Sequence, residues 1–367
     1  MVEPVIKFTR GVPPPDSFPF DQIAECSNSI LDRDSEGVLQ YGPAGGYRPL
    51  RSWLANQYQS DENRVVVGQG SLQLLDTFAR ISLKPGSIVY TEAPSYDRAI
   101  NVFRRAGADV IGIPLDSDGL DVDIVETRLI KGERPVLFYI IPDFQNPSGM
   151  ELSIEKRKTL ASLAEKYGFW IIEDSPYRKL RYRGLDIPTI HEFAPEQVIY
   201  MSSISKLISP GLRVGYFIMP EAIAPKFLKF TEDTYVTPSL FNQGIVLEYI
   251  HRGWLEPNID KLKKLYQPRL DILLQTLEEE FKEIADWYKP DGGFFVGVTL
   301  KQETNVDQLL EASKAAGILL SDGRGFFAQS PRNCFIRLPF CALTPAEIRD
   351  GIIRLATTIR DIGIQNS

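Results

Sequence analysis

Histidine and cysteine are scarce in this chain. Its 367 residues include two histidines, His191 and His251, which argues against a histidine-rich metal site and against a Ser-His-Asp hydrolase. The three cysteines, Cys26, Cys334 and Cys341, are odd in number and far from any CxxC spacing. They are typical of free thiols in a reducing compartment, so we expect a cytoplasmic protein and no metal site.

Long apolar runs and basic clusters are missing as well. No apolar run approaches the roughly 20 residues that span a bilayer, and the first stretch, M-V-E-P-V-I-K-F-T-R, lacks the apolar core of a signal peptide. Lysine and arginine are scattered and the net charge is −7, whereas nucleic-acid binding usually requires a basic face. We therefore expect neither a membrane nor a nucleic acid as a partner.

From residue 64 onward, apolar runs alternate with helical patterns. Seven runs predict strands, at Val65–Val67, Ser87–Thr91, Asp109–Ile113, Val136–Ile141, Phe169–Glu173, Gln197–Met201 and Val214–Met219. Helical patterns between several of them cover Tyr96–Ala106, Val122–Ile130 and Ile154–Tyr167. This order predicts an α/β protein with a mostly parallel, seven-stranded sheet that helices cover on both faces. Ligands of such sheets bind beyond the carboxyl ends of the strands.

The character of the chain changes near residue 258. A long helical pattern covers Lys261–Ile284, and Pro268 in its interior either kinks the helix or marks a new start. A further strand and a last amphipathic helix follow, at Asn333–Leu338 and Pro345–Ile359. We expect a large domain of residues 39–257 and a smaller α+β domain of residues 1–38 and 258–367.

One lysine stands in the loop between the last two strands predicted for the sheet. The stretch M-S-S-I-S-K-L-I-S-P-G-L-R-V-G-Y places Lys206 after Ser203 and Ser205 and before a Pro-Gly turn and Arg213. A lysine in this setting is able to form a Schiff base with a phosphorylated aldehyde while its neighbours bind the phosphate. Taken alone, a surface lysine in a hairpin loop is the better interpretation, so the rest of the chain has to decide.

A second element suited to a phosphate follows the first strand. Gly68-Gln69-Gly70-Ser71 is a tight turn that leads into a helical pattern at Leu72–Ile81. Backbone N–H groups at a helix N-terminus favour an anion. The turn is neither a P-loop, which needs G-K-[ST], nor a dinucleotide fingerprint, which needs a third glycine. The phosphate of another cofactor fits, with the amides of Ser71 and Leu72 as donors.

Polar or aromatic side chains follow three further strands. Asn146 follows one strand, and Asp174 ends the next, with Tyr177 three residues later. Tyr96 follows an earlier strand. A pyridine-aldehyde cofactor needs a carboxylate beside its ring nitrogen, donors for its phenolic oxygen and an aromatic ring on its face. Each residue also has a plain alternative, with Asp174 as a cap, Asn146 in a turn and Tyr96 in the core, but their joint order lowers the risk of a chance match.

Together, these motifs resemble the fold-type I pyridoxal-phosphate aminotransferases over nearly the whole chain. The sequence is most similar to the branch that holds 2-aminoadipate and kynurenine aminotransferases and the catalytic domains of MocR-type regulators. The most specific motif is S-x-S-K-x-x-x-P-G-x-R-x-G at Ser203–Gly215. Further motifs agree in order and spacing, namely Q-Y-G-P-A-G-G-Y-x-P-L-R (Gln40–Arg51), P-D-F-Q-N-P-S-G (Pro142–Gly149), E-D-S-P-Y (Glu173–Tyr177), D-G-G-F-F (Asp291–Phe295) and I-R-L-P-F (Ile336–Phe340).

The resemblance implies that pyridoxal 5'-phosphate is the cofactor and that Lys206 binds it covalently. It further implies that Asp174 pairs with the ring nitrogen and that Tyr96 stacks on the ring. Asn146 and Tyr177 would then bond the phenolic oxygen. The phosphate would be held by the two helix amides and by the hydroxyls and the arginine on either side of the lysine.

The same resemblance implies the substrate contacts and the assembly. Arg337 would bind the α-carboxylate of the substrate, a bidentate task suited to arginine, with Asn146 beside it. Tyr41 would reach the phosphate of the cofactor in the neighbouring subunit, which implies a homodimer with shared active sites. Two positions depart from the family pattern: Leu72 stands where glutamine is frequent, and Asp143 stands where threonine is common.

The resulting prediction is transamination between an amino acid and a 2-oxo acid, with 2-oxoglutarate as the expected acceptor. One alternative keeps the cofactor but changes the reaction to that of a lyase, decarboxylase or cyclase. Another is a ligand-sensing MocR-like domain, but the family pattern begins by about Phe8 and leaves no room for a DNA-binding part. We therefore expect an enzyme.

Overall fold

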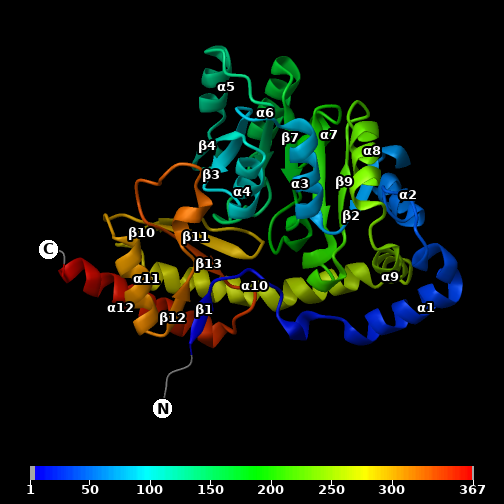
Figure 1. Ribbon diagram of the computed structural model, residues 1–367. Coiled ribbons are helices and arrows are strands. Elements are labelled where there is room, and N and C mark those ends of the chain that lie inside the picture. The colour runs from blue at the N-terminus through cyan, green and yellow to red at the C-terminus, as the bar shows by residue number, and fades with distance from the viewer. Residues whose placement is uncertain (1–4, 366–367) are drawn as a thin grey trace.

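The computed structural model describes residues 5–365 (Figure 1). Within this range the larger sheet has eight strands in the order β2-β9-β8-β7-β6-β3-β4-β5. Neighbours in the run β8-β7-β6-β3-β4 are parallel, whereas β9 is antiparallel to both β8 and β2. The strands are β2 (Val65–Gly68), β3 (Ile88–Ala93), β4 (Asp109–Asp116), β5 (Gly119–Leu120), β6 (Leu137–Ile140), β7 (Trp170–Asp174), β8 (Val198–Ser203) and β9 (Gly215–Ile218). The prediction of a mostly parallel α/β sheet is confirmed.

The sequence predicts seven strands for this sheet, and the eighth is β5. It forms a hairpin with the end of β4, where Leu120 lies opposite Leu115. Two residues are too few to show the alternation that marks a strand in a sequence. The predicted number of strands was therefore wrong by one, the short edge strand β5. The other seven strands lie where the apolar runs predict them.

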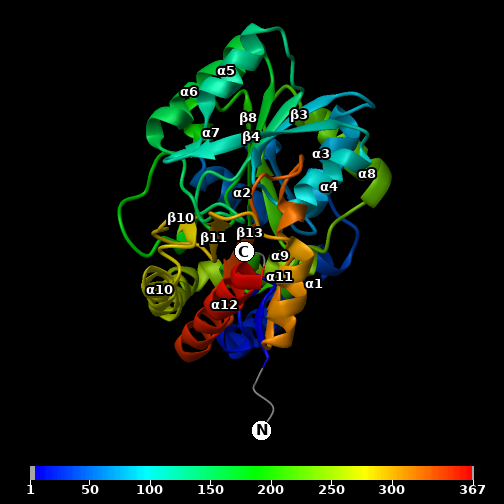
Figure 2. The same ribbon diagram turned by 90° about the vertical axis from the view of Figure 1, so that its left-hand side faces the viewer.

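Helices cover both faces of the larger sheet. In Figure 2, α5, α6 and α7 lie on one side of the sheet and α3, α4 and α8 lie on the other. Each set buries its apolar side chains against the sheet in a separate cluster. These helices are α3 (Ser71–Ser82), α4 (Asp97–Arg105), α5 (Val122–Ile130), α6 (Ile154–Tyr167), α7 (Ile190–Phe193) and α8 (Ala224–Tyr235).

A second group of elements packs below the larger sheet in Figure 1. Its antiparallel sheet has the order β10-β11-β13, and β1 pairs in parallel with β12. The elements are β1 (Ile6–Phe8), α10 (Leu255–Glu280), β10 (Ala285–Trp287), β11 (Phe295–Leu300), α11 (Val306–Ala315), β12 (Ile318–Leu320), β13 (Phe335–Pro339) and α12 (Pro345–Gln365). Helix α10 runs uninterrupted through Pro268. Among residues 5–365, no helix is both long enough and apolar enough to cross a membrane.

Three helices complete the chain, namely α1 (Phe20–Leu39), α2 (Arg48–Gln57) and α9 (Leu240–His251). Helix α1 packs along α9, where Gly244 lies against Ile30. The sequence did not predict α9, because a helix that is apolar nearly all round lacks the periodicity of a surface helix. Eight of its residues are buried. Helix α1 is 20 residues long, and non-helical dihedral angles at Asp34 mark a kink in it.

Candidate active site

A cavity of about 650 Å³ lies where both sheets contribute residues. Eleven of the predicted site residues line it, coming from the ends of β7 and β8, from β13 and from neighbouring turns. They are Ser71, Leu72, Tyr96, Asn146, Asp174, Tyr177, Ser203, Ser205, Lys206, Arg213 and Arg337. Tyr41 does not line the cavity, and the residue is 78% exposed.

Lys206 ends a short 3-10 turn, Ile204–Lys206, directly after β8. Its Nζ donates to the carbonyl oxygen of Gly11 over 3.2 Å and lies 5.7 Å from the ring centre of Phe294. Burial lowers the pKa of Lys206 below its ordinary value, and the charges of Arg213 and Arg337 act in the same direction. A lysine in such a setting more readily gives the neutral amine that attacks a carbonyl.

Asp174 ends β7 and is 5% exposed. Its Oδ2 accepts a hydrogen bond from the hydroxyl of Tyr139 over 2.6 Å. Among the described residues its Oδ1 has no hydrogen-bond partner, although it is buried. Burial raises the pKa of Asp174 to about 7, while the bond from Tyr139 and the charge of Lys206 oppose that rise. A buried acceptor without a donor fits a cofactor that brings its own N–H group.

The turn before α3 forms a cradle of backbone amides. The N–H group of Gln73 donates to the carbonyl oxygen of Gly70, the N-cap residue, over 3.2 Å. No acceptor for the amides of Ser71 and Leu72 is found in the described part of the chain. On the other side of the turn, a Cβ atom added to Gly215 would collide with the Ser71 nitrogen. Only glycine lets β9 approach the helix so closely, so the cradle fits a phosphate group.

Arg213 closes the same cradle. It has a left-handed backbone conformation with φ of 53°, and its Nη2 donates to the carbonyl oxygen of Gln69 over 3.2 Å. A Cβ added to Gly70, whose φ is 89°, would collide with this guanidinium. The guanidinium thus lies against the turn, where a cation complements a bound phosphate.

Two hydroxyl groups complete this side of the cavity. The Oγ atoms of Ser203 and Ser205 lie 2.9 Å apart, and Ser203 Oγ accepts from the amide of Ser205 over 3.1 Å. Both residues are buried. The two hydroxyls are therefore held by the turn that also positions the lysine.

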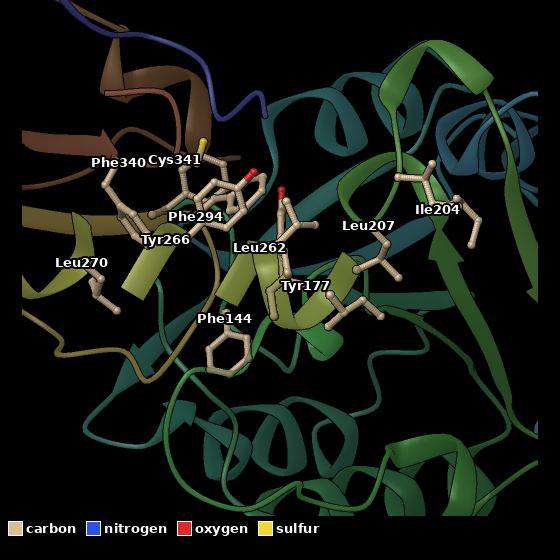
Figure 3. Packing of buried hydrophobic residues seen from close by; sticks show 14 of the residues in the cluster. Phe144, Tyr177, Ile204, Leu207, Leu262, Tyr266, Leu270, Phe294, Phe340 and Cys341 are labelled. Atoms are coloured by element: carbon tan, nitrogen blue, oxygen red, sulfur yellow. The ribbon is translucent and has the colours of Figure 1, made fainter. Parts of the chain in front are cut away.

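Asn146 and Tyr177 approach the cavity from the loops after β6 and β7. Asn146 Oδ1 accepts from Arg337 Nη1 over 3.0 Å. The ring of Tyr177 packs 5.5 Å from that of Phe294 (Figure 3) and 5.7 Å from that of Phe295. Tyr96 lies at the N-cap of α4, half-buried. The packing fixes the Tyr177 ring, so its hydroxyl can only occupy a narrow range of positions.

Arg337 extends from β13 between two aromatic rings. Its guanidinium carbon lies 4.5 Å from the ring centre of Phe326 and 5.0 Å from that of Phe295. Its Nη2 donates to the carbonyl oxygen of Thr9 over 2.7 Å, and its buried Nε has no partner among residues 5–365. The stacked fork is suited to a planar carboxylate.

Sequence reasoning missed two contributors to this site. Tyr139 lies in the strand L-F-Y-I, where a tyrosine is ordinary, so its bond to Asp174 leaves no sequence signal. No role was predicted for the segment Thr9–Val12, yet it lines the cavity and offers backbone carbonyls to Lys206 and Arg337. Backbone contacts do not depend on residue type, so composition alone does not reveal them.

The whole chain is similar to known aminotransferases. The family described as "Aminotransferase class I and II" matches residues 3–355. Aromatic-amino-acid aminotransferase 1 of Thermococcus litoralis is 35% identical, over 97% of this chain and 88% of its own length. The crystal structure of a multiple substrate aminotransferase from Thermococcus profundus has a TM-score of 0.94 at 34% identity and covers 99% of this chain and 93% of its own.

A second solved structure carries a cofactor derivative. The alpha-aminoadipate aminotransferase of Thermus thermophilus, complexed with N-(5'-phosphopyridoxyl)-L-leucine, has a TM-score of 0.92 at 30% identity. It covers 99% of this chain and 94% of its own. The chain belongs to the class I and II aminotransferases, and it is a pyridoxal-phosphate-dependent transaminase.

Proposed function

We propose that the cavity binds pyridoxal 5'-phosphate on Lys206 and exchanges an amino group between an amino acid and a 2-oxo acid in two successive half-reactions. The observation that carries this proposal is the buried Oδ1 of Asp174, which has no donor among the described residues and belongs to the same cavity as Lys206. When bound, the cofactor supplies the electron sink that Cα–H cleavage requires.

We assign the cofactor contacts by the chemistry of each group. Asp174 would hold the ring nitrogen in its protonated form, Asn146 and Tyr177 would bond the phenolic oxygen, and Tyr96 would cover a ring face. The phosphate would lie in the cradle and bond the amides, hydroxyls and guanidinium around it, namely those of Ser71, Leu72, Ser203, Ser205 and Arg213.

The protein then has two tasks in each half-reaction. Arg337 binds the α-carboxylate of the amino acid and thereby orients its Cα–H bond, with Asn146 fixing the guanidinium. Lys206, as a neutral amine, would take the proton from Cα and so act as a base. Its ammonium form would then donate that proton to the cofactor and so act as an acid. Its lowered pKa favours the base form at the start of this transfer.

We propose 2-oxoglutarate as an acceptor, and aromatic amino acids or 2-aminoadipate as donors. Two further cations, Arg10 and Arg98, line the cavity besides Lys206, Arg213 and Arg337. Among the described residues, neither guanidinium has a hydrogen-bond or ion-pair partner, and both residues are exposed. A second carboxylate on the substrate would find a partner in such an arginine.

We also propose a homodimer in the cytoplasm. Tyr41 lies outside the cavity with most of its side chain exposed, so a role at a cofactor phosphate requires a second subunit. The division into a large domain of residues 39–257 and a small domain of residues 1–38 and 258–367 remains a proposal, in which α1 would join the two units through its packing on α9. Sedimentation of the holoenzyme tests the dimer.

A single assay tests the reaction. The purified holoenzyme is mixed with a panel of amino acids without any acceptor, and absorbance follows the cofactor. A transaminase converts the cofactor to its pyridoxamine form and releases one 2-oxo acid per site. Release of carbon dioxide or ammonia with an unchanged cofactor would instead indicate a decarboxylase or lyase and overturn the proposal.

A further inference from the structure

The Asp174 carboxylate accepts a hydrogen bond from a neighbouring strand. Tyr139 lies on β6, and its hydroxyl donates to Asp174 Oδ2 over 2.6 Å. Strands β6 and β7 are paired in parallel, with Tyr139 opposite Ile172, two residues before Asp174. Tyr139 is fully buried and is not among the residues that line the cavity. Tyr139 therefore contacts the Asp174 carboxylate from the protein interior and not from the cavity.

The tyrosine is itself held rigidly. Its ring packs edge to face on Phe103 of α4, with 5.8 Å between the ring centres. Burial holds the pKa of Tyr139 well above its ordinary value, so the hydroxyl keeps its proton. A protonated hydroxyl can act as a hydrogen-bond donor to the carboxylate.

The two oxygens of Asp174 are thus unequal. One is engaged by the tyrosine, and the other is buried without a partner in the described part of the chain. We propose that Tyr139 is a positioning residue, which fixes the rotation of the Asp174 carboxylate so that one defined oxygen is left to accept the N–H of the cofactor ring. This inference rests on the proposed binding of pyridoxal 5'-phosphate in the cavity.

The hydrogen bond has a second effect on the same group. It stabilises the charged form of Asp174 and so opposes the rise of its pKa that burial causes. Without the bond, the carboxyl would hold its own proton more tightly and pair less well with a protonated ring. Geometry and charge therefore both predict weaker cofactor binding when the hydroxyl is removed.

The test compares two tyrosines of equal burial. Tyr139→Phe removes the hydroxyl at Asp174. Tyr90→Phe removes one from the neighbouring strand β3, where a fully buried tyrosine donates to Glu133 over 2.8 Å, away from the cavity. Titration of each apoprotein with pyridoxal 5'-phosphate gives the Kd, absorbance gives the ratio of the two bands of the bound cofactor, and a melting curve gives Tm.

We expect Tyr139→Phe to raise the Kd roughly tenfold, the effect of a lost hydrogen bond to a charged group, and to change the band ratio. Tyr90→Phe should lower Tm but leave Kd and spectrum unchanged. A wild-type Kd and spectrum in Tyr139→Phe would overturn the inference. Tyr139→His, which retains an N–H donor, is the second variant: partial recovery of the Kd supports the role, and a loss as large as in Tyr139→Phe contradicts it.

The outcome also separates this inference from the proposed function. If the wild-type protein binds no pyridoxal 5'-phosphate, the proposed function fails. If the wild type binds it and forms the pyridoxamine product while Tyr139→Phe behaves like the wild type, only the role of Tyr139 fails.

Discussion

The guanidinium of Arg337 and the side chain of Asn146 meet in the cavity, where Nη1 donates to Oδ1 over 3.0 Å. Arg337 lies on β13 of the smaller sheet, and Asn146 follows β6 of the larger sheet, 191 residues earlier in the chain. This contact joins the two sheets at the point where we place the substrate, so the geometry of the substrate site depends on how the two parts of the chain pack.

Replacement of Arg337 should affect the substrate and spare the cofactor. Arg337→Ala is expected to lower kcat/KM for the amino donor roughly 100-fold, because truncating one partner of a desolvated ion pair costs several kcal/mol. Arg337→Lys, which loses the planar fork, should recover only part of that loss. Steady-state kinetics and a pyridoxal 5'-phosphate titration give the two quantities.

The matched control for this experiment is Arg349→Ala. Arg349 is exposed and pairs with Glu279, and neither residue lines the cavity. It should leave kcat/KM within about twofold. An equal loss in both variants would mean that Arg337 acts only through folding.

Replacement of Lys206 should abolish turnover. Lys206→Ala removes both the covalent anchor and the proton carrier, so we expect no steady-state activity and loss of the visible absorbance of the lysine-bound cofactor. Lys179→Ala is the control, because Lys179 is 61% exposed in its side chain and forms an ion pair with Glu256 away from the cavity. Full activity in Lys206→Ala would contradict the proposed role.

Two glycines of the same motif should respond differently to alanine. A methyl group on Gly215 would collide with the amide nitrogen of Ser71 in the phosphate cradle, whereas one on Gly211 would meet only Ser209 Oγ at 3.6 Å. We expect Gly215→Ala to weaken pyridoxal 5'-phosphate binding at least tenfold, and Gly211→Ala to bind it as the wild type does. Equal affinities for the two variants would show that the close approach of β9 to α3 is dispensable.

The pH dependence of stability should report Glu92. It is buried on β3, its Oε2 accepts from the amide of Ile141 over 2.9 Å, and burial raises its pKa from 4.5 to about 8. The folded protein holds this proton more tightly than the unfolded chain does. The stabilising contribution is therefore complete below about pH 4.5 and is lost as the pH rises through 8.

Glu92→Gln keeps an acceptor for Ile141 and removes the charge. Its free energy of unfolding should match the wild type near pH 4.5 and exceed it by ~5 kcal/mol at pH 9, since the pKa of Glu92 rises from 4.5 to about 8 and each pKa unit corresponds to about 1.4 kcal/mol. Glu133→Gln is a control of opposite sign, because hydrogen bonds from Tyr90 and Arg128 lower the pKa of Glu133. Urea unfolding at both pH values measures the difference, and a pH-independent gap would contradict the assignment.

Arg10 should distinguish between acceptors. Arg10→Ala is expected to raise KM for 2-oxoglutarate roughly tenfold, as the loss of one charge-assisted hydrogen bond would. It should leave KM for pyruvate, which has no second carboxylate, within about twofold. Arg98→Ala provides the matching test of the other exposed arginine. An equal rise for both acceptors would remove Arg10 as the partner of a distal carboxylate.

Much of the fold could be predicted because strands of a parallel sheet are apolar on both faces and stand out as runs. The positions of Lys206, Asp174 and Asn146 followed from the same logic, since polar groups after such strands meet at one edge of the sheet. The cavity contains all three. The prediction of these three site residues therefore depended mainly on their positions at the ends of strands.

The rest depended on relationships that a sequence does not record. The helix α9 is buried by α1, a partner more than 200 residues away in the chain, so its outer face has no polar stripe. The role of Tyr139 depends on strand register, which brings its hydroxyl to Asp174. These are tertiary facts, and local patterns do not contain them.

The segment before α1 has a consequence for ligand choice. The carbonyl oxygens of Thr9 and Gly11 accept hydrogen bonds from Arg337 and Lys206, the two cations to which we assign the substrate and the cofactor. A ligand oxygen that takes the place of Thr9 at Nη2 of Arg337 replaces a neutral peptide oxygen. A carboxylate gains from this exchange because its full charge binds a guanidinium more strongly than a carbonyl does. An ester or amide of the same amino acid brings only another neutral oxygen, so we expect the segment to favour ligands with a free carboxylate.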